Sequence, residues 1–270
     1  MKLKGKTVIV TGGASGIGAA LATRFSTEGA QVVIADVNKS VATELAKSIG
    51  GTAYKCDVTC EVQVNQLVEF TESELGSVDM FCSNAGICFG QPSHAASASN
   101  EHWNHCWNVH VKAHVYAARA VLPSMIERGE GYLLQMASAA GLLNQIGDAA
   151  YSATKHAAVG FAESLSISHA DDGVKVSVIC PQYVSTPMLG YGDDEESDAS
   201  GVITSHSVAD TVVRGIDEEI FLILPHPQVS KFIQLKSADY DKWLQGMRTL
   251  QHRVVKEAGS TNIADLHKWV

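Results

Sequence analysis

Three residues in the middle of the chain, Ser138, Tyr151 and Lys155, have types and a spacing suited to proton transfer. If residues 151–155 lie on a helix, Tyr151 and Lys155 are four positions apart and share one face. An ammonium group beside a phenol favours the phenolate, so it lowers the tyrosine pKa from about 10 toward the range of a general base. The Ser138 hydroxyl can donate a hydrogen bond to a substrate oxygen and accept one from it. The three side chains therefore predict a site that moves a proton at an alcohol or a carbonyl.

A glycine-rich segment near the N-terminus, Thr11-Gly-Gly-Ala-Ser-Gly-Ile-Gly18, gives this site its context. It follows a predicted strand and opens a predicted helix. Gly12, Gly16 and Gly18 permit a tight turn and a close approach of backbone N–H groups to a pyrophosphate, which a helix N-terminus also attracts. The spacing differs from the G-x-G-x-x-G of other dinucleotide sites, and a lone glycine cluster is often only a turn. A residue further along the chain strengthens the interpretation of this segment as a dinucleotide site.

Asp36 is that residue, and it lies at the end of the second predicted strand. A carboxylate there can bind a ribose 2′-hydroxyl and repels a 2′-phosphate. Residue 14 is alanine, so no arginine is placed there to receive a phosphate, although Lys39 is nearby. The pattern predicts NAD as the cofactor and leaves NADP as the less favoured alternative.

Short β-branched runs alternate along the chain with segments of helical periodicity. The predicted strands are 7–10, 31–35, 53–56, 80–82, 132–136, 175–179 and 221–224. The predicted helices are 17–29, 41–49, 62–75, 102–128, 150–170, 208–219 and 229–258. Such alternation is typical of βαβ units with right-handed crossovers. It predicts an α/β fold of the Rossmann type, a doubly wound parallel sheet with helices on both faces.

The length of 270 residues suits one catalytic domain over 1–270, although length alone also allows two small domains. The acidic run in 193–198 is either a solvated loop or the tip of a lid around 188–205, and the segment after it is predicted to be a helical C-terminal extension. The net charge of -9 argues against nucleic-acid and anionic-membrane partners. No apolar run approaches the roughly 20 residues that span a bilayer. Six cysteines without C-x-x-C pairs indicate reduced thiols in a cytoplasmic protein.

Six motifs in order resemble those of the short-chain dehydrogenases/reductases of the smaller, single-domain type. They are Thr11–Gly18, Asp57-Val58, Asn84-Ala-Gly86, Ser138, Tyr151-x3-Lys155 and Pro181-x4-Thr186, and they cover about residues 5–190. The resemblance implies a seven-stranded parallel sheet and assembly as a homodimer or homotetramer. Together with the glycine motif and Asp36, it implies cofactor contacts by Gly12, Ser15, Gly16, Ile17, Gly18, Asp36, Asp57, Val58, Asn84, Ala85, Gly86, Tyr151, Lys155, Pro181, Val184 and Thr186. Taken singly, Asp57 could be only a helix cap, and 84–86 only a turn.

The chain departs from the family pattern at two places. Gln182 follows Pro181 where the family has glycine. His110 occupies the position of the helix asparagine that completes the family's catalytic tetrad with Ser138, Tyr151 and Lys155. Asn108 lies two residues earlier, about 200° around a helix, and is not expected to replace it. His110 is either a proton relay, with an ordinary pKa near 6.5, or a packing residue.

These residues predict an NAD-dependent oxidoreductase that interconverts a secondary alcohol and a ketone, with no metal. The predicted substrate pocket is mostly apolar and consists of Phe89, Leu142, Gln145, Gln182, Tyr183 and Met188. It suits a hydrophobic or aromatic small molecule, although several of these side chains could be plain core. Two alternatives remain open. One is a 3-oxoacyl-type carbonyl reductase, which Asp36 disfavours; the other is an NAD-sensing protein without turnover, which the three catalytic side chains argue against.

Overall fold

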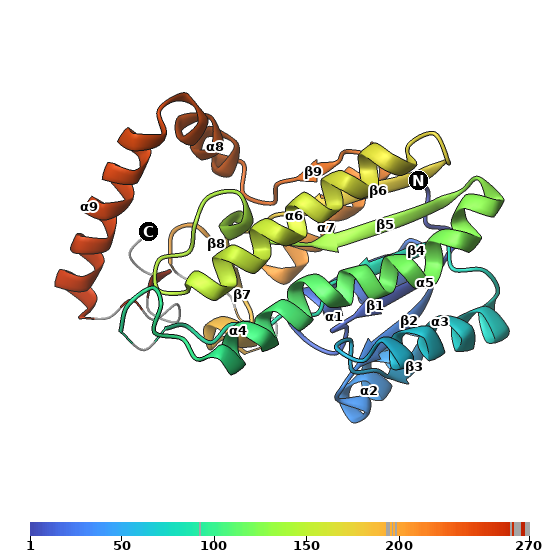
Figure 1. Ribbon diagram of the computed structural model, residues 1–270. Helices are drawn as coiled ribbons and strands as arrows, with labels where there is room; N and C mark the ends of the chain where they lie inside the picture. Colours follow the sequence, from blue (N-terminus) through green and yellow to red (C-terminus); the bar gives the residue numbers. More distant parts are fainter. Residues whose placement is uncertain are drawn as a thin grey trace.

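Seven parallel strands form the central sheet of the protein, in the order β3-β2-β1-β4-β5-β6-β9 (Figure 1). The computed structural model describes residues 1–91, 93–192, 195, 197, 199–259, 261 and 266–267. The strands are β1 (Thr7–Thr11), β2 (Gln31–Asp36), β3 (Thr52–Lys55), β4 (Met80–Ser83), β5 (Gly131–Met136), β6 (Val174–Ile179) and β9 (Leu222–Ile223). The strand order reverses between β1 and β4, and open α/β sheets bind ligands at the carboxyl ends of such a pair. The predicted Rossmann-type fold is confirmed.

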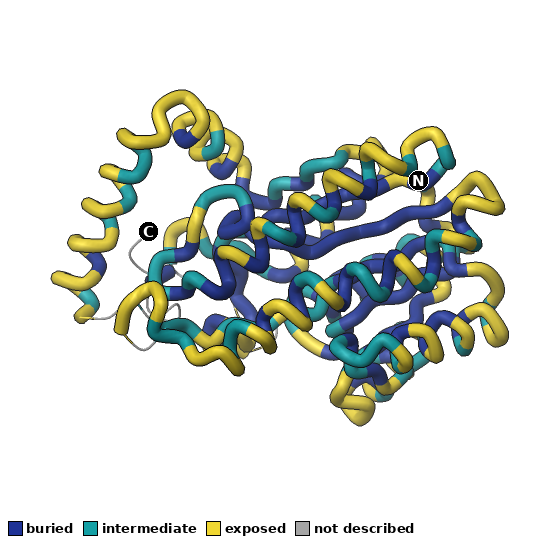
Figure 2. Tube along the Cα trace, viewed as in Figure 1, coloured by how far each residue is buried: buried dark blue, intermediate teal, exposed yellow. Residues whose placement is uncertain are grey.

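Helices cover both faces of this sheet (Figure 1). One face carries α1 (Gly16–Thr27), α2 (Lys39–Ile49) and α7 (Ser205–Asp217), and the other carries α3 (Glu61–Leu75), α5 (Ala113–Arg128) and α6 (Ala149–His169). On the first face Leu21, Phe25 and Val212 are fully buried, and on the second Leu67 and Ala158 are. Burying a large apolar side chain stabilises the fold by ~1.5–3 kcal/mol. The two apolar layers hold the strands in place and so fix the positions of their carboxyl ends. Figure 2 shows that the central strands are buried.

Two of the predicted helices are interrupted in the structure. The segment predicted as one helix over 102–128 consists of α4 (Asn100–Trp107), a π-helical turn (Asn108–Lys112) and α5. Single π-helical turns inside helices are frequent at functional sites, and His110 lies at the middle of this one. The segment 229–258 divides into α8 (Gln228–Ala238) and α9 (Tyr240–Ala258) because Asp239 caps the N-terminus of α9, its carboxylate accepting the Lys242 N–H at 2.9 Å.

A second, smaller sheet was not predicted. It pairs β7 (Tyr183–Ser185) with β8 (Val202–Thr204) in parallel, and each strand is too short to show a periodic pattern. The predicted lid around 188–205 lies mostly between these two strands. Asp193, Asp194, Glu196 and Asp198 of its acidic run fall outside the described residues, as do residues 260, 262–265 and 268–270 of the C-terminal extension. In the described part of the chain no helix has the length and apolar character needed to cross a membrane.

Candidate active site

A cleft of about 730 Å³ opens at the carboxyl ends of the strands. Ser138 and every residue predicted to contact the cofactor line it. Five of the predicted substrate-pocket residues line it as well: Phe89, Gln145, Gln182, Tyr183 and Met188. Leu142 is not among the lining residues; its side chain packs against the core between the sheet and α3, α5 and α6. His110 is fully buried behind the cleft wall.

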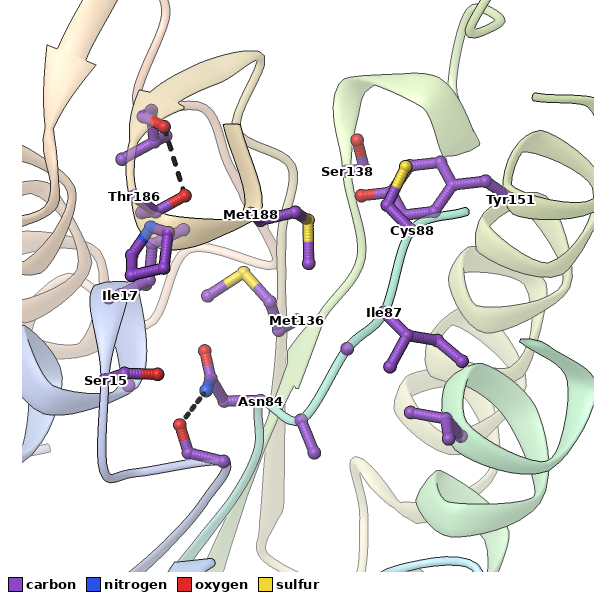
Figure 3. Close-up of a pocket in the computed structure, with 18 of the residues that line it drawn as sticks. Ser15, Ile17, Asn84, Ile87, Cys88, Met136, Ser138, Tyr151, Thr186 and Met188 are labelled. Carbon is purple, nitrogen blue, oxygen red and sulfur yellow. Dashed lines mark hydrogen bonds between the residues drawn. The ribbon is translucent and has the colours of Figure 1, made fainter. Parts of the chain in front are cut away.

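The glycine motif at the junction of β1 and α1 leaves no room for a side chain at Gly12, Gly13 or Gly18. A Cβ atom at Gly12, where φ is +59°, would lie 2.7 Å from the Ala85 Cα, and one at Gly18 would lie 2.0 Å from the Gly12 carbonyl oxygen. The Asn84 side-chain amide at the end of β4 donates to the carbonyl oxygens of Thr11 at 2.9 Å and Gly12 at 3.1 Å. Figure 3 draws one of these bonds. The loop is therefore held from β4, and the N-terminus of α1 faces the cleft, as a pyrophosphate site requires.

The carboxylate of Asp36 is held against this loop by two backbone groups. One oxygen accepts the Ala14 N–H at 3.1 Å, and the other accepts the Asn38 N–H at 2.9 Å. Its position at the cleft edge suits a ribose hydroxyl. Asp57 also lines the cleft, but one of its oxygens accepts both the N–H and the hydroxyl of Thr59. Asp57 was considered as a helix cap, but the N-cap residue of α3 is Cys60, and Asp57 instead stabilises the turn before that helix.

Helix α6 places Tyr151 and Lys155 on one face, as their spacing predicts. Its N-cap residue is Asp148, whose carboxylate accepts the Tyr151 N–H at 2.9 Å. The Lys155 Nζ lies 5.6 Å from the centroid of the Tyr151 ring and donates to the Met136 carbonyl at 3.1 Å. Ser138 caps the short 3₁₀ helix Ala139–Gly141, and its hydroxyl lies beside that of Tyr151 (Figure 3). The three predicted side chains therefore meet in one place.

The protonation of this cluster differs from the sequence-based expectation. Burial raises the pKa of Tyr151 above its ordinary value, and the hydrogen bond with Ser138 offsets only part of that rise. Burial lowers the pKa of Lys155 to about 8. Desolvation disfavours both charged forms, so the neighbouring ammonium alone does not produce the expected fall in the tyrosine pKa. Without a bound ligand, Tyr151 is a neutral phenol that can donate and accept hydrogen bonds.

The contacts of His110 favour packing over proton relay. Its Nε2 accepts the Ile87 N–H at 3.1 Å, which leaves Nδ1 to donate to the Thr154 hydroxyl at 2.9 Å. The imidazole meets the Tyr151 ring edge to face, with centroids 5.4 Å apart. Burial and the charge of Lys155 lower the pKa of His110 well below its ordinary value. A neutral His110 thus supports the Tyr151 ring and fixes the loop that begins at Ile87.

Asp148 is a site residue that the sequence-based reasoning missed. Its second carboxylate oxygen accepts the Gly90 N–H at 2.9 Å and the Cys88 thiol at 3.4 Å, so it ties the loop after β4 to the start of α6. Burial raises the pKa of the Cys88 thiol to about 12, so this thiol is protonated. The signal was available, because an aspartate directly before a predicted helix is a preferred N-cap. Among the described residues no group of three or more His, Cys, Asp or Glu side chains is arranged to hold a metal ion.

Comparisons with known proteins agree with this geometry. Residues 6–197 match the short chain dehydrogenase family. The 1-deoxy-11-beta-hydroxypentalenate dehydrogenase of Streptomyces exfoliatus is 34% identical over 252 residues, which are 90% of each chain. Epidermal retinol dehydrogenase 2 of Mus musculus is 34% identical over 68% of this chain and 62% of its own.

Two solved structures have the same fold. A short-chain dehydrogenase/reductase from Burkholderia phymatum in complex with NAD superposes with a TM-score of 0.80 at 25% identity, over 89% of this chain and 96% of the other. The 3-ketoacyl-(acyl-carrier-protein) reductase of Brucella melitensis, complexed with NADH, superposes with a TM-score of 0.75 at 28% identity, over 82% of this chain and 97% of the other.

Proposed function

This chain belongs to the short-chain dehydrogenase family, and we propose that it is an NAD-dependent enzyme that interconverts a secondary alcohol and a ketone. The observation that carries the proposal is that Ser138, Tyr151 and Lys155 share one cleft with a glycine loop and an acidic residue suited to NAD. The cleft is of ordinary size for a ligand site. Both solved structures described above hold NAD or NADH, which supports the choice of cofactor.

The residues present fit NAD at one end of the cleft. Gly12 and Gly18 leave room where a Cβ would clash, and the N-terminus of α1 attracts the pyrophosphate. Asp36 would bind the adenine ribose hydroxyls and would disfavour a 2′-phosphate. Thr186 and Val184 line the part of the cleft proposed for the carboxamide. When bound, the nicotinamide supplies the hydride acceptor for oxidation and the donor for reduction.

Side chains of the protein carry out the proton transfer. In the oxidation, Ser138 hydrogen-bonds the substrate oxygen and Tyr151 accepts the hydroxyl proton. Lys155 would hold the nicotinamide ribose, and its charge favours the phenolate that Tyr151 must become. Burial raises the pKa of Tyr151, so the positive charge that an oxidised cofactor would bring to the site would also favour the phenolate. His110 supports the Tyr151 ring during this step.

The substrate end of the cleft suits an apolar alcohol. Phe89, Tyr183, Met188 and Leu189 line it, and Lys155 is the lone Lys or Arg among the described lining residues. Such a lining does not favour a carboxylate or phosphate on the substrate. Two of the relatives are named as dehydrogenases of hydroxypentalenate and of retinol, which supports a hydroxyl group as the reacting group. The class of substrate proposed is therefore a hydrophobic or aromatic secondary alcohol.

A 3-oxoacyl-type reductase is the second candidate. The Brucella melitensis reductase is complexed with NADH, so a preference for NAD does not by itself separate the two functions. The lack of further basic residues among the described lining residues of the cleft favours the alcohol, because a phosphate-bearing acyl carrier calls for cations.

Assembly and location are part of the proposal. We place the protein in the cytoplasm because its six cysteines are free. We propose a homodimer or homotetramer formed through α5 and α6, which leave Ile126 and Ile167 exposed. A light-scattering mass at micromolar concentration near 29 kDa, that of one chain, would contradict the assembly.

The function is tested by following NADH absorbance with NAD and a panel of secondary alcohols, and its consumption with the matching ketones and with 3-oxoacyl thioesters. We expect turnover with hydrophobic alcohols and much weaker turnover with NADP. Turnover only with thioesters would favour the second candidate. NAD binding without turnover of any compound would favour a sensor.

A further inference from the structure

Helix α8 lies beyond the carboxyl ends of the strands, between β9 and α9 (Figure 1). It follows the residues that match the family, 6–197. Its apolar contact with the rest of the protein is small, since Val229 and Lys236 are its buried residues while Phe232 and Leu235 are exposed. Hydrophobic packing therefore contributes little to holding α8, and its position depends on polar contacts at its two ends.

The first contact is made by His226, two residues before α8. Its Nδ1 accepts the Gln182 N–H at 3.0 Å, and its Nε2 donates to the Tyr183 carbonyl at 3.0 Å. The imidazole is 2% exposed, and burial lowers its pKa, so it stays in the neutral form that makes both bonds. Gln182 and Tyr183 line the cleft. The N-terminal end of α8 is thus fixed to one wall.

The second contact is made by Lys236, near the C-terminal end of α8. Its Nζ donates to the carbonyl oxygens of Leu142 at 2.7 Å and Leu143 at 3.1 Å. The same ammonium lies 4.8 Å from the centroid of the Trp243 ring and 5.4 Å from that of Tyr240, both on α9. Carbonyl oxygens and aromatic faces are favourable surroundings for a largely desolvated cation. Lys236 therefore joins α8 and α9 to residues 142–143.

Residues 142–143 belong to the wall that carries Ser138. They follow the 3₁₀ helix capped by Ser138 and precede Gln145, which lines the cleft. On its inner side this wall is held by α6, where the Ser152 hydroxyl accepts the Gln145 N–H at 2.8 Å. On its outer side it is held by Lys236. Both attachments are needed to fix a segment that has little regular structure of its own.

We propose that α8 braces the two walls of the substrate cleft, and that His226 and Lys236 are positioning residues that set how large a substrate the cleft accepts. The selectivity part of this proposal rests on the proposed function, whereas the brace itself does not. Both residues bind backbone groups, and Gln228 at the start of α8 also donates to the Gln182 side-chain oxygen at 3.4 Å. The C-terminal part of the chain thus shapes a site whose catalytic residues lie within residues 6–197, which match the family.

Hydrogen exchange of the ligand-free protein tests the brace without relying on activity. Lys236→Met keeps the aliphatic stem and removes the donors, and Lys231→Met, at an exposed position on the same helix, is the matched control. We expect amides of 139–146 to exchange about tenfold faster in Lys236→Met, the size of effect expected for a lost charge-assisted hydrogen bond. In His226→Phe we expect the amides of 181–185 to exchange about tenfold faster than in the wild type. Amides of β1 and β2 should be unchanged in both.

Kinetics test the selectivity. In Lys236→Met we expect the ratio of KM for bulky alcohols to KM for small alcohols to change about tenfold from its wild-type value. The values of kcat and the dissociation constant of NAD should be nearly unchanged. Exchange in 139–146 that equals the Lys231→Met control, or that rises evenly over the whole sheet, would overturn the brace. If Lys236→Met does not fold, Trp243→Leu replaces it as the test, because this variant keeps the two bonds from Lys236 to the carbonyl oxygens. We expect its amides of 139–146 to exchange faster than in the wild type, but by less than in Lys236→Met. An unchanged exchange rate in 139–146 would again overturn the brace. If the wild type oxidises no alcohol, the proposed function fails while the exchange data still decide the brace.

Discussion

The two ends of the cleft are built in different ways. At the cofactor end, the strand ends position the groups directly: Asn84 holds the backbone at Thr11 and Gly12, and Asp36 holds that at Ala14. At the substrate end, side chains from distant segments hold the walls, with Lys236 bonded to residues 142–143 and His226 to residues 182–183. The strand ends therefore position the cofactor residues, and elements outside the sheet shape the space for the substrate. Substitutions at the substrate end can therefore alter substrate selectivity without changing the reaction that is catalysed.

Removing the proton acceptor should have the largest effect of all. Tyr151→Phe keeps the ring that packs against His110 but leaves the substrate hydroxyl without a base, so turnover should fall by about 10²–10⁴-fold. NAD binding, measured by calorimetry, should persist because the glycine loop is untouched. A variant that keeps most of its turnover would end the assignment of Tyr151.

A change at the cofactor end should alter cofactor choice and leave substrate selectivity as it is. Asp36→Ala combined with Ala14→Arg removes a repulsive carboxylate and adds a partner for a 2′-phosphate. We expect the ratio of kcat/KM for NAD to that for NADP to fall by about 10–100-fold, since hydrogen bonds to charged groups contribute ~1.5–3 kcal/mol. A wild type that already uses both cofactors equally would show that Asp36 does not discriminate.

Asp148 connects the loop after β4 to the start of α6, so its loss should affect stability and catalysis together. In Asp148→Ala the N–H groups of Tyr151 and Gly90 lose their acceptor, and loss of an N-cap costs about 0.5–2 kcal/mol. Asp148→Ser can still cap α6 but cannot reach both groups, so it should recover stability more than activity. Urea unfolding and kcat measured on both variants check this; equal recovery of the two would show that Asp148 is only a cap.

The smallest effect is expected at His110. Since burial holds the pKa of His110 well below 6.5, this residue stays neutral across the physiological range and contributes no ionisation there. The pH–rate profiles of the wild type and His110→Asn should therefore superimpose in shape between about pH 6 and 8. A histidine-like ionisation that is present in the wild type and absent from the variant would show that His110 relays protons.

Local patterns in the sequence predicted much of this molecule. The alternation of β-branched and amphipathic segments indicated the parallel sheet, and the spacing from Tyr151 to Lys155 placed both side chains on one helix face. Gly12, Gly18 and Asp36 lie within one βαβ unit, so their meeting follows from local geometry. The other residues predicted for the cofactor came from the resemblance to the short-chain dehydrogenases/reductases, and they line the cleft as well.

Features that depend on distant contacts were not predictable in the same way. The π-helical turn at His110, the short pair β7 and β8 and the bonds from Lys236 to residues 142–143 join segments that no periodic pattern relates. The direction of the Tyr151 pKa shift also depends on burial, which only the folded chain determines. Leu142 was placed in the pocket by its apolar character, which suits core and cleft equally.

Transfer of a label from substrate to cofactor tests the central claim most directly. The wild type is incubated with NAD and a hydrophobic secondary alcohol that carries deuterium on the carbinol carbon, and the reduced cofactor is analysed by mass spectrometry. We expect one deuterium in each molecule of NADH formed, and we expect Tyr151→Phe to form about 10²–10⁴-fold less of it. Reduced cofactor without deuterium, or equal formation by the two proteins, would contradict it.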